Sequence, residues 1–322
     1  MTQRIITFVK NWTLPIAMVT GIVMYFLLAG FDTFEPIRHP VHVFVNHFCP
    51  ILVFVQLLVT FCKIDPKDLM PSKWHIWLGL FQLVSSVMVA ALVIFLCKEP
   101  NALRYGLEGI VVMLICPTAT AAAVITGKLG GNAASLTTYT LISNIIAAVV
   151  VPLLFPLMEP SDISFISAFS KMLGHAVLLL IVPFILAFLL RKFVPKAQQY
   201  IASKKDLAFY LWAICLTCII GVAAHVSVTC DVPASSQILT AIAILVICSA
   251  LFAIGKKFGS HFGDRISCGQ ALGQKNTTLA IWMTYAYLNP LAIIGPGSYI
   301  VWQNIINSYQ LYLKRKNKLR IN

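Results

Sequence analysis

Charged side chains are scarce in this sequence. Of its 322 residues only 11% are Asp, Glu, Lys or Arg, whereas 59% are hydrophobic. Soluble domains usually carry about 25% charged residues. In a bilayer, lipid takes the place of the protein core as the apolar phase. The composition therefore excludes an ordinary soluble domain and predicts an integral membrane protein.

Acidic residues are rarer still. Eleven Asp and Glu stand against 24 Lys and Arg, which gives a formal net charge of +13. In a soluble protein this excess would favour nucleic-acid binding. Here the basic residues lie between apolar runs, where they report membrane topology, so we predict no nucleic-acid partner.

Motifs for catalysis and metal binding are also missing. No nucleophile–base pair, metal cluster or phosphate-binding loop is visible. There are nine cysteines, and the odd number argues against a disulfide framework. The pair Cys215-x-x-Cys218 has no second pair or histidine cluster that would complete a zinc site. We assign no catalytic residue, no metal ligand and no cofactor, and we expect that the protein is not an enzyme.

Long apolar runs are what the chain has in abundance. A bilayer crossing takes about 20 apolar residues. The first run is too long for the apolar part of a signal peptide, so it counts as a span. Pro117 interrupts the fourth run, and the ninth contains several amide side chains. The ten predicted spans are 12–31, 42–62, 74–97, 106–128, 133–157, 165–190, 207–228, 235–255, 266–288 and 291–313.

Lys and Arg are distributed unequally between the loops. With ten spans both termini lie on one side, and 18 Lys and Arg fall on that side against three, Arg38, Lys98 and Arg104, on the other. Basic loops stay in the cytoplasm. We therefore expect a multi-pass protein of the cell inner membrane with both termini cytoplasmic. The basic run 314–320 is interpreted as an anchor to anionic membrane lipids.

The two halves of the chain share one plan. Each holds five spans, and in each the fourth span is the broken, polar one. Because five is odd, the second half enters the membrane inverted. Inverted repeats with broken helices are typical of secondary transporters. We predict an all-α membrane protein with ten transmembrane helices in one transporter domain, residues 1–322, with inverted repeats at about 1–160 and 161–322.

Polar residues lie inside the fourth and fifth spans. Pro117 removes a backbone donor and frees a carbonyl group, and in lipid such a break needs water, protein or a ligand to satisfy it. Two interpretations remain open for Thr137, Thr138 and Thr140 of the fifth span. They line a site, or they bond back to carbonyl groups of their own helix.

The ninth span contains the run GQKNTT at residues 273–278. A lysine at mid-membrane costs roughly 2.5–3.5 kcal/mol on insertion scales, so we expect this run to face a functional cavity. The alternative is that Lys275 lies at the membrane surface. In the last span Asn304 and Asn307 share a helix face, and they either line the cavity or bond a neighbouring helix.

Two stretches around these polar residues resemble the bile acid:sodium symporter family, of the bile/arsenite/riboflavin transporter superfamily. They are 116–157, with CPTAT, GGNAASL and VPLL, and 270–312, with QALGQKNTTLA and VWQNI. The resemblance covers essentially the whole chain. It implies ten spans, a panel domain and a core domain in which the broken helices 4 and 9 cross. It also implies sodium-coupled uptake of organic anions such as bile acids or pantothenate-like acids.

The resemblance also assigns site residues, with departures. Thr120, Asn276 and Asn304 match positions that touch substrate in the family, and Gln82 matches a glutamine ligand of sodium. The chain departs from the family at three places of its sodium sites: Ala122-Ala123 replaces Ser-Asn, Ala271 replaces a bridging glutamate, and Lys275 replaces a sodium-ligating glutamine.

These departures change the predicted sodium sites. Sodium exchanges its hydration shell for several oxygen atoms, whereas Lys275 brings donors and places a positive charge where the sodium ion would lie. We predict that conventional sodium coupling is lost or altered. If Lys275 stays protonated, transport is facilitated and independent of sodium. If it loses and regains its proton in each cycle, transport couples to protons, and the sequence leaves both versions open.

Two functions remain open. The first is a secondary transporter of a small organic anion, in which the half-helix N-termini and Lys275 supply a positive field for a carboxylate. The alternative is a non-transporting membrane sensor or receptor on the same scaffold. Neither the substrate nor the oligomeric state follows from the sequence. The predicted substrate-binding residues are Thr118, Thr120, Asn276, Thr277, Gln303 and Asn304, and the predicted ion-site or ion-replacing residues are Gln82, Thr140, Gln274 and Lys275.

Overall fold

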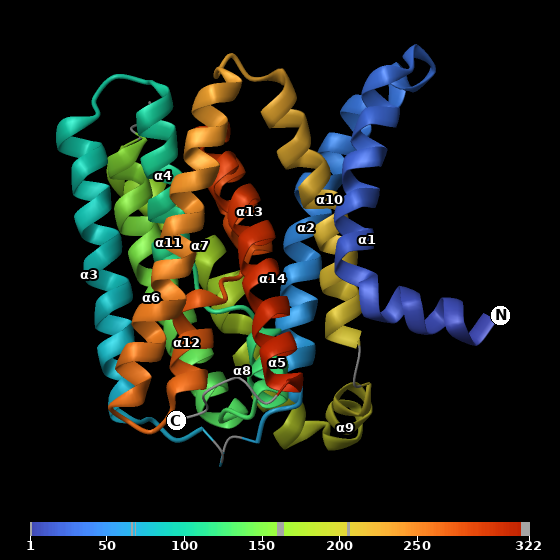
Figure 1. Ribbon diagram of the computed structural model, residues 1–322, viewed down its shortest axis with the longest axis vertical. Helices are drawn as coiled ribbons and strands as arrows, with labels where there is room; N and C mark the ends of the chain where they lie inside the picture. The colour runs from blue at the N-terminus through green and yellow to red at the C-terminus, as the bar shows by residue number, and fades with distance from the viewer. Residues whose placement is uncertain (1, 66, 68, 160–163, 205–206, 317–322) are drawn as a thin grey trace.

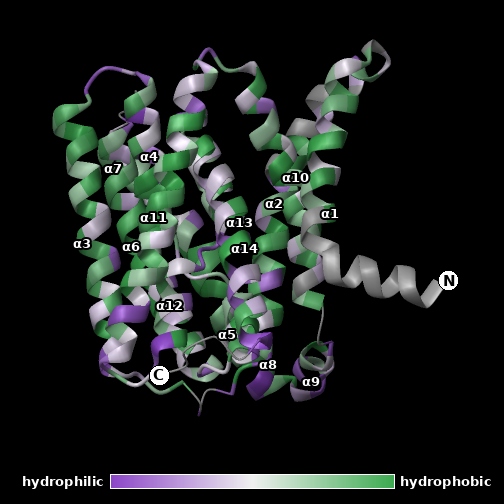
Figure 2. Ribbon diagram, viewed as in Figure 1, coloured by the Kyte–Doolittle hydropathy of each residue, from purple (hydrophilic) through white to green (hydrophobic). Residues whose placement is uncertain are grey.

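The described part of the chain is a bundle of helices. The computed structural model describes residues 2–65, 67, 69–159, 164–204 and 207–316. Within these residues, six helical segments are long and apolar enough to cross a membrane. Hydrophobic residues cover the middle stretches of the helices, and hydrophilic residues gather around the end where α8, α9 and α12 lie (Figure 2). The all-helical, multi-pass prediction is confirmed.

In the described residues up to Glu159, the main elements are six α-helices and a short 3-10 turn. Each predicted span of this half corresponds to one helix, except the fourth, which is divided in two. The elements are α1 (Thr2–Gly30), η1 (Asp32–Phe34), α2 (Glu35–Cys62), α3 (Lys73–Leu96), α4 (Ala102–Ile115), α5 (Ala122–Leu129) and α6 (Ala133–Met158).

The second half follows a similar order, with a π-helical segment, a short helix and a 3-10 turn before α14 in addition. A π-helical segment joins α7 to α8 inside the sixth predicted span, and α9 lies in a predicted loop, where Pro195 favours its first turn. The elements are α7 (Phe165–Ala176), η3 (Val177–Ile181), α8 (Val182–Phe193), α9 (Pro195–Ser203), α10 (Leu207–Thr229), α11 (Ala234–Ser260), α12 (Arg265–Gly273), α13 (Thr277–Tyr287), η4 (Pro290–Ile293) and α14 (Ile294–Arg315).

The helices form two groups side by side (Figure 1). On one flank α10 contacts both α1 and α2, and α2 contacts α8. On the other flank α3, α4, α6, α11 and α12 lie together, with α13 and α14 between the groups. The broken pair followed by a long helix occurs twice, as α4–α5–α6 and as α12–α13–α14. That order agrees with the ten-span inverted repeat, which stays a prediction.

Both predicted helix breaks are confirmed. Helix α4 ends at Ile115, and its cap Cys116 has an extended ψ of 133°, because the residue before a proline avoids the α conformation. Helix α5 ends at Leu129, and its C-cap Gly130 has a φ of 91°, a conformation that favours glycine. Helix α6 then begins at Ala133, and the side chain of its N-cap Asn132 accepts from the Ser135 N–H. The second break follows Gly273.

The basic segments gather at one end of the bundle. The α2–α3 loop, the α8–α10 region, the α11–α12 loop and the end of α14 all lie there (Figure 1). Asp65 of the first segment pairs with Arg191 of the second at 3.0 Å. At the other end Arg104 bonds Glu108 at 2.9 Å and Glu159 at 3.3 Å, tying α4 to the end of α6. The eighth span is longer than predicted, since α11 continues to Ser260.

Glycine allows α11 and α12 to lie with their backbones in contact. A Cβ atom on Gly255 would lie 2.3 Å from the carbonyl oxygen of Cys268, and one on Gly259 would lie 2.6 Å from that of Asp264. Close backbone approach at small residues is a usual mode of helix packing in membranes. Because backbone atoms cannot move aside cheaply, these contacts determine how α12 lies against α11.

We expect Gly255→Ala to destabilise the protein by about 1–3 kcal/mol, the usual cost of overpacking. The matched control is Gly174→Ala in α7, where an added Cβ atom meets nothing within 4 Å. The measurement is thermal unfolding in detergent. Equal melting temperatures for the two variants would contradict the close backbone contact of α11 with α12.

Candidate functional site

The two helix breaks cross each other as an antiparallel pair. Thr118 and Lys275 form an isolated antiparallel bridge. The Ala119 N–H donates to the carbonyl oxygen of Gln274 at 2.9 Å, and the Asn276 N–H donates to that of Pro117 at 2.9 Å. Each break therefore satisfies backbone groups that the other leaves without a helical partner, as a buried position in a membrane protein requires.

The side chain of Lys275 is buried at this crossing. It is 1% exposed, and its ammonium donates to the carbonyl oxygens of Leu114 at 3.2 Å and Cys116 at 3.0 Å. Both carbonyl groups belong to the C-terminal end of α4, where the helix leaves acceptors unpaired and carries partial negative charge. Lys275 is therefore enclosed by protein and does not lie on the surface of the bundle.

Gln82 of α3 completes a row of three occupied carbonyl groups. Its Nε2 donates to the carbonyl oxygen of Ile115 at 2.7 Å, between the two acceptors of Lys275. Its Oε1 accepts from the hydroxyl group of Tyr139 at 3.1 Å. The structure thus brings Gln82 and Lys275, both predicted ion-site residues, to one place, and both present N–H groups to the end of α4.

The other predicted ion-site residues contribute differently. Gln274 takes part through its backbone carbonyl, as described above. The hydroxyl group of Thr140 donates to the Leu136 carbonyl of its own helix at 3.0 Å. Thr137 and Thr138 bond back in the same way, to Ala133 and Ala134. The interpretation that the threonines of the fifth span bond back to their own helix is confirmed.

Three of the predicted substrate-binding side chains hold the crossing together. Thr118 donates to the carbonyl oxygen of Ala271 at 2.7 Å. Gln303 of α14 accepts from the backbone N–H of Lys275 at 3.0 Å and donates to the Thr277 hydroxyl group at 3.4 Å. All three side chains are at most 1% exposed. In this conformation they position the broken helices.

The remaining three predicted substrate-binding residues lie at the edges of the crossing. Asn276 caps α13 by accepting from the Leu279 N–H at 3.2 Å. Thr120 accepts from Gln56 Nε2 of α2 at 2.7 Å and keeps its own proton to donate. Asn304 is half-buried and donates to the carbonyl oxygen of Ile300 in its own helix.

Unlike Asn304, Asn307 bonds a residue of another helix. It is 4% exposed, and its Oδ1 accepts from Gln270 Nε2 of α12 at 3.0 Å. Asn307 therefore bonds a neighbouring helix, one of the two roles left open for this pair. Gln270 and Asn307 join α12 to α14 directly below the second break.

Gln56 was not among the predicted site residues. The signal in the sequence is a single glutamine inside the apolar run of the second span. Its bond to Thr120 links α2 with the segment between α4 and α5. Gln56 is thus a polar contact of α2 with the first helix break.

Two helix N-termini also meet the crossing. Helix α5 begins at Ala122 and α13 at Thr277, each directly after its break. Helix N-termini carry partial positive charge and bind anions. Within the described residues, the Gln274 Oε1 and Thr278 Oγ1 atoms are buried and find no hydrogen-bond partner. The crossing therefore joins a fixed cation, two positive helix ends and unpaired polar atoms.

Comparison with known proteins identifies the family of this chain. The model of the SBF-like CPA transporter family matches residues 17–287, a range that includes both helix breaks and Lys275. A protein of Bacillus subtilis (strain 168), named uncharacterized sodium-dependent transporter YocS, is 24% identical over 303 residues, which cover 89% of this chain and 87% of the relative. The chain belongs to the SBF-like CPA transporter family.

Proposed function

We propose that the protein is a secondary transporter of a small organic anion, in which the ammonium of Lys275 takes the place of a sodium ion. The observation that carries the proposal is the pair of bonds from Lys275 Nζ to the carbonyl oxygens of Leu114 and Cys116. In transporters with broken helices, such carbonyl groups at half-helix C-termini coordinate the coupling cation.

The oxygen atoms that a sodium ion needs are already engaged at this place. Sodium binding requires several oxygens in exchange for the hydration shell. The carbonyl groups of residues 114–116 accept from Lys275 and Gln82, and the Gln82 Oε1 accepts from Tyr139. A sodium ion would have to displace an ammonium of equal charge, with no gain in electrostatic energy.

The substrate class follows from the charges at the crossing. The N-terminal ends of α5 and α13 and the Lys275 ammonium are all positive, and a carboxylate bound between them would be stabilised by each. Thr120 and Asn276 add neutral hydrogen-bonding groups beside these ends. These features support a small organic carboxylate, of the bile acid or pantothenate type.

The coupling mode has two versions. A lysine that remains protonated gives facilitated transport, and one that releases its proton during the cycle gives proton coupling. The Bacillus subtilis relative is named as sodium-dependent, so sodium coupling is the competing expectation. The experiments below separate these outcomes.

The proposed orientation places both termini and the basic end of the bundle in the cytoplasm, by the positive-inside rule. A reporter that is active only in the cytoplasm should be active when it is fused after residue 322. Activity of a C-terminal reporter that needs the periplasm would contradict this topology.

Sodium should not stabilise the purified protein. We expect the same melting temperature in NaCl and in KCl of equal concentration, because Lys275 occupies the cation site. A specific sodium site filled at 100 times its dissociation constant would add about 2.7 kcal/mol, a shift that thermal unfolding resolves easily. Sodium-specific stabilisation of the wild-type protein would overturn the replacement of sodium by Lys275.

Lys275→Gln should impair transport without creating sodium dependence, because the amide restores only one of the lost sodium ligands. Loss of the charged hydrogen bonds, worth about 1.5–3 kcal/mol, predicts a decrease in uptake of about 10–100-fold. The measurement is uptake into proteoliposomes of carboxylates that stabilise the wild-type protein, with cholate and pantothenate tested first, under imposed sodium or proton gradients.

The control for this variant is Lys171→Gln, which removes an exposed lysine of α7 and should leave uptake unchanged. Uptake driven by a sodium gradient in the wild-type protein would contradict both versions of the proposal. Carboxylate binding without any uptake would instead support a membrane sensor on this scaffold.

A further inference from the structure

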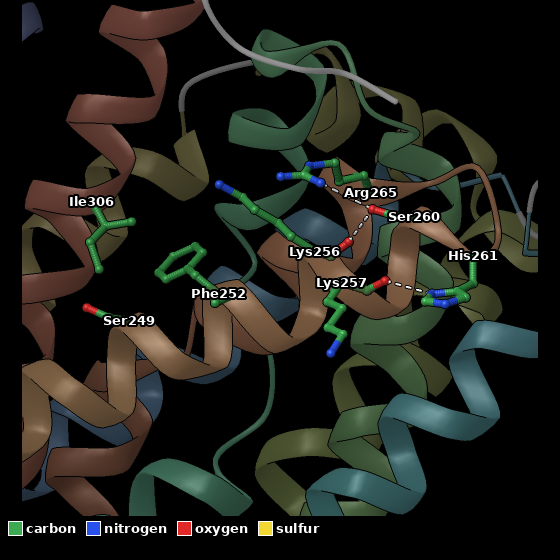
Figure 3. A pocket seen from close by; sticks show the side chains of 9 residues that line it. Ser249, Phe252, Lys256, Lys257, Ser260, His261, Arg265 and Ile306 are labelled. Atoms are coloured by element: carbon green, nitrogen blue, oxygen red, sulfur yellow. Dashed lines mark hydrogen bonds between the residues drawn. The ribbon is translucent and has the colours of Figure 1, made fainter.

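A second polar site lies away from the crossing, at the basic end of the bundle. A cavity of about 490 Å³ opens between the end of α11, the start of α12 and the side of α14 (Figure 3). It includes no residue of the crossing described above. The lining residues are Ser249, Phe252, Ala253, Lys256, Lys257, Ser260, His261, Arg265 and Ile306.

The lining carries positive charge only. Three of its nine residues are Lys or Arg, a fourth is His261, and none is acidic. Lys256 and Arg265 extend toward the same space, whereas Lys257 and His261 lie farther along α11 (Figure 3). Asp264, the neighbour of Arg265 in sequence, interacts with Ser267 and does not line the cavity. Two cations that extend into one space would be stabilised by an anion between them.

Local contacts hold the basic side chains in place. Arg265 Nη1 donates to the Ser260 hydroxyl oxygen at 3.2 Å, and that hydroxyl group donates to the carbonyl oxygen of Lys256 at 2.9 Å (Figure 3). The stem of Lys256 lies over Gly269 of α12, where an added Cβ atom would be 2.6 Å from Lys256 Cγ. The backbone contact between α11 and α12 thus presents Lys256 and Arg265 together.

An apolar surface leads into the basic cavity. Phe252 and Ile306 form its apolar wall. Toward the N-terminal end of α11, Ile242 is 51% and Val246 is 62% exposed. The spacing of four residues places them on one helix face. Ser249 and Ala253 continue this exposed face down to the cavity. In a membrane this face lies against acyl chains, so the site is apolar on one side and cationic on the other.

We propose that the cavity binds the headgroup of an anionic phospholipid. Lys256 and Arg265 contact the phosphate group, Lys257 and His261 face the outer part of the headgroup, and the acyl chains lie along the exposed face of α11. The apolar face favours a lipid over a soluble phosphate compound, because only an amphiphile would cover both parts of the site. Basic sites between helices at the cytoplasmic surface bind such headgroups.

The test compares a pocket variant with a charge-matched control. The pocket variant combines Lys256→Gln with Arg265→Gln, and the control combines Lys192→Gln with Lys196→Gln, two exposed lysines near α9. Titration of the purified protein with phosphatidylglycerol, followed by native mass spectrometry, gives the dissociation constant of the first bound lipid. Each basic group near an anionic lipid surface strengthens lipid binding. The loss of two such groups should raise the dissociation constant about thirtyfold. The control should retain the wild-type constant.

Two further measurements separate the alternatives. Phosphatidylcholine should bind wild type and pocket variant equally, and glycerol phosphate, which lacks acyl chains, should not compete with phosphatidylglycerol. Competition by glycerol phosphate would show a site for a soluble anion and overturn the lipid assignment. Equal weakening in the control would also overturn it. Both variants should unfold at the wild-type temperature in lipid-free detergent. An altered dissociation constant then reports a change at the lipid site and not a loss of folding.

Discussion

The fold depends on one exchange of hydrogen bonds in its interior. Two helices break where they would otherwise cross the bundle, and each break leaves backbone groups that lipid cannot satisfy. The antiparallel contact of Thr118 with Lys275 pairs these groups, and the Lys275 ammonium occupies the carbonyl groups at the end of α4. Gln82, Gln303 and Thr118 then bond to the same few residues from three other directions. Without a cation at this place, the end of α4 would present unpaired carbonyl groups to a buried space.

A covalently attached cation has different consequences from a bound ion. A sodium ion can enter and leave, so its binding free energy changes with the ion gradient, and the gradient can drive a conformational change. The ammonium of Lys275 cannot leave. While protonated, it supplies the positive charge at the crossing, and only its proton can be exchanged. If Lys275 replaces sodium as proposed, the same substitution removes the ordinary means by which sodium would couple to the crossing.

The basic end of the bundle shows a second use of positive charge. At the crossing, the Lys275 ammonium has two acceptors within the protein, so its charge stabilises the fold. At the cavity between α11, α12 and α14, Lys256 and Arg265 face a space without an acidic partner among the residues that line it. The two sites are connected through α12, which begins at Arg265 and ends at Gly273, directly before the crossing. The proposed lipid site and the crossing thus lie at opposite ends of one short helix.

The sequence by itself determined the class of fold, because hydropathy and the polar interruptions are local properties. Pro117 and the run at 273–278 showed where the helices break, and the exchange of a glutamine for Lys275 indicated a changed cation site. Sequence could not show which groups Lys275 would reach, since Leu114 and Cys116 lie far from it along the chain. It also did not separate Asn304 from Asn307, or reveal that Gln56 bonds Thr120, because those roles depend on which helices are neighbours. Only the tertiary structure decided these contacts, since a buried polar group takes whichever partner the packing of the helices brings within hydrogen-bonding distance.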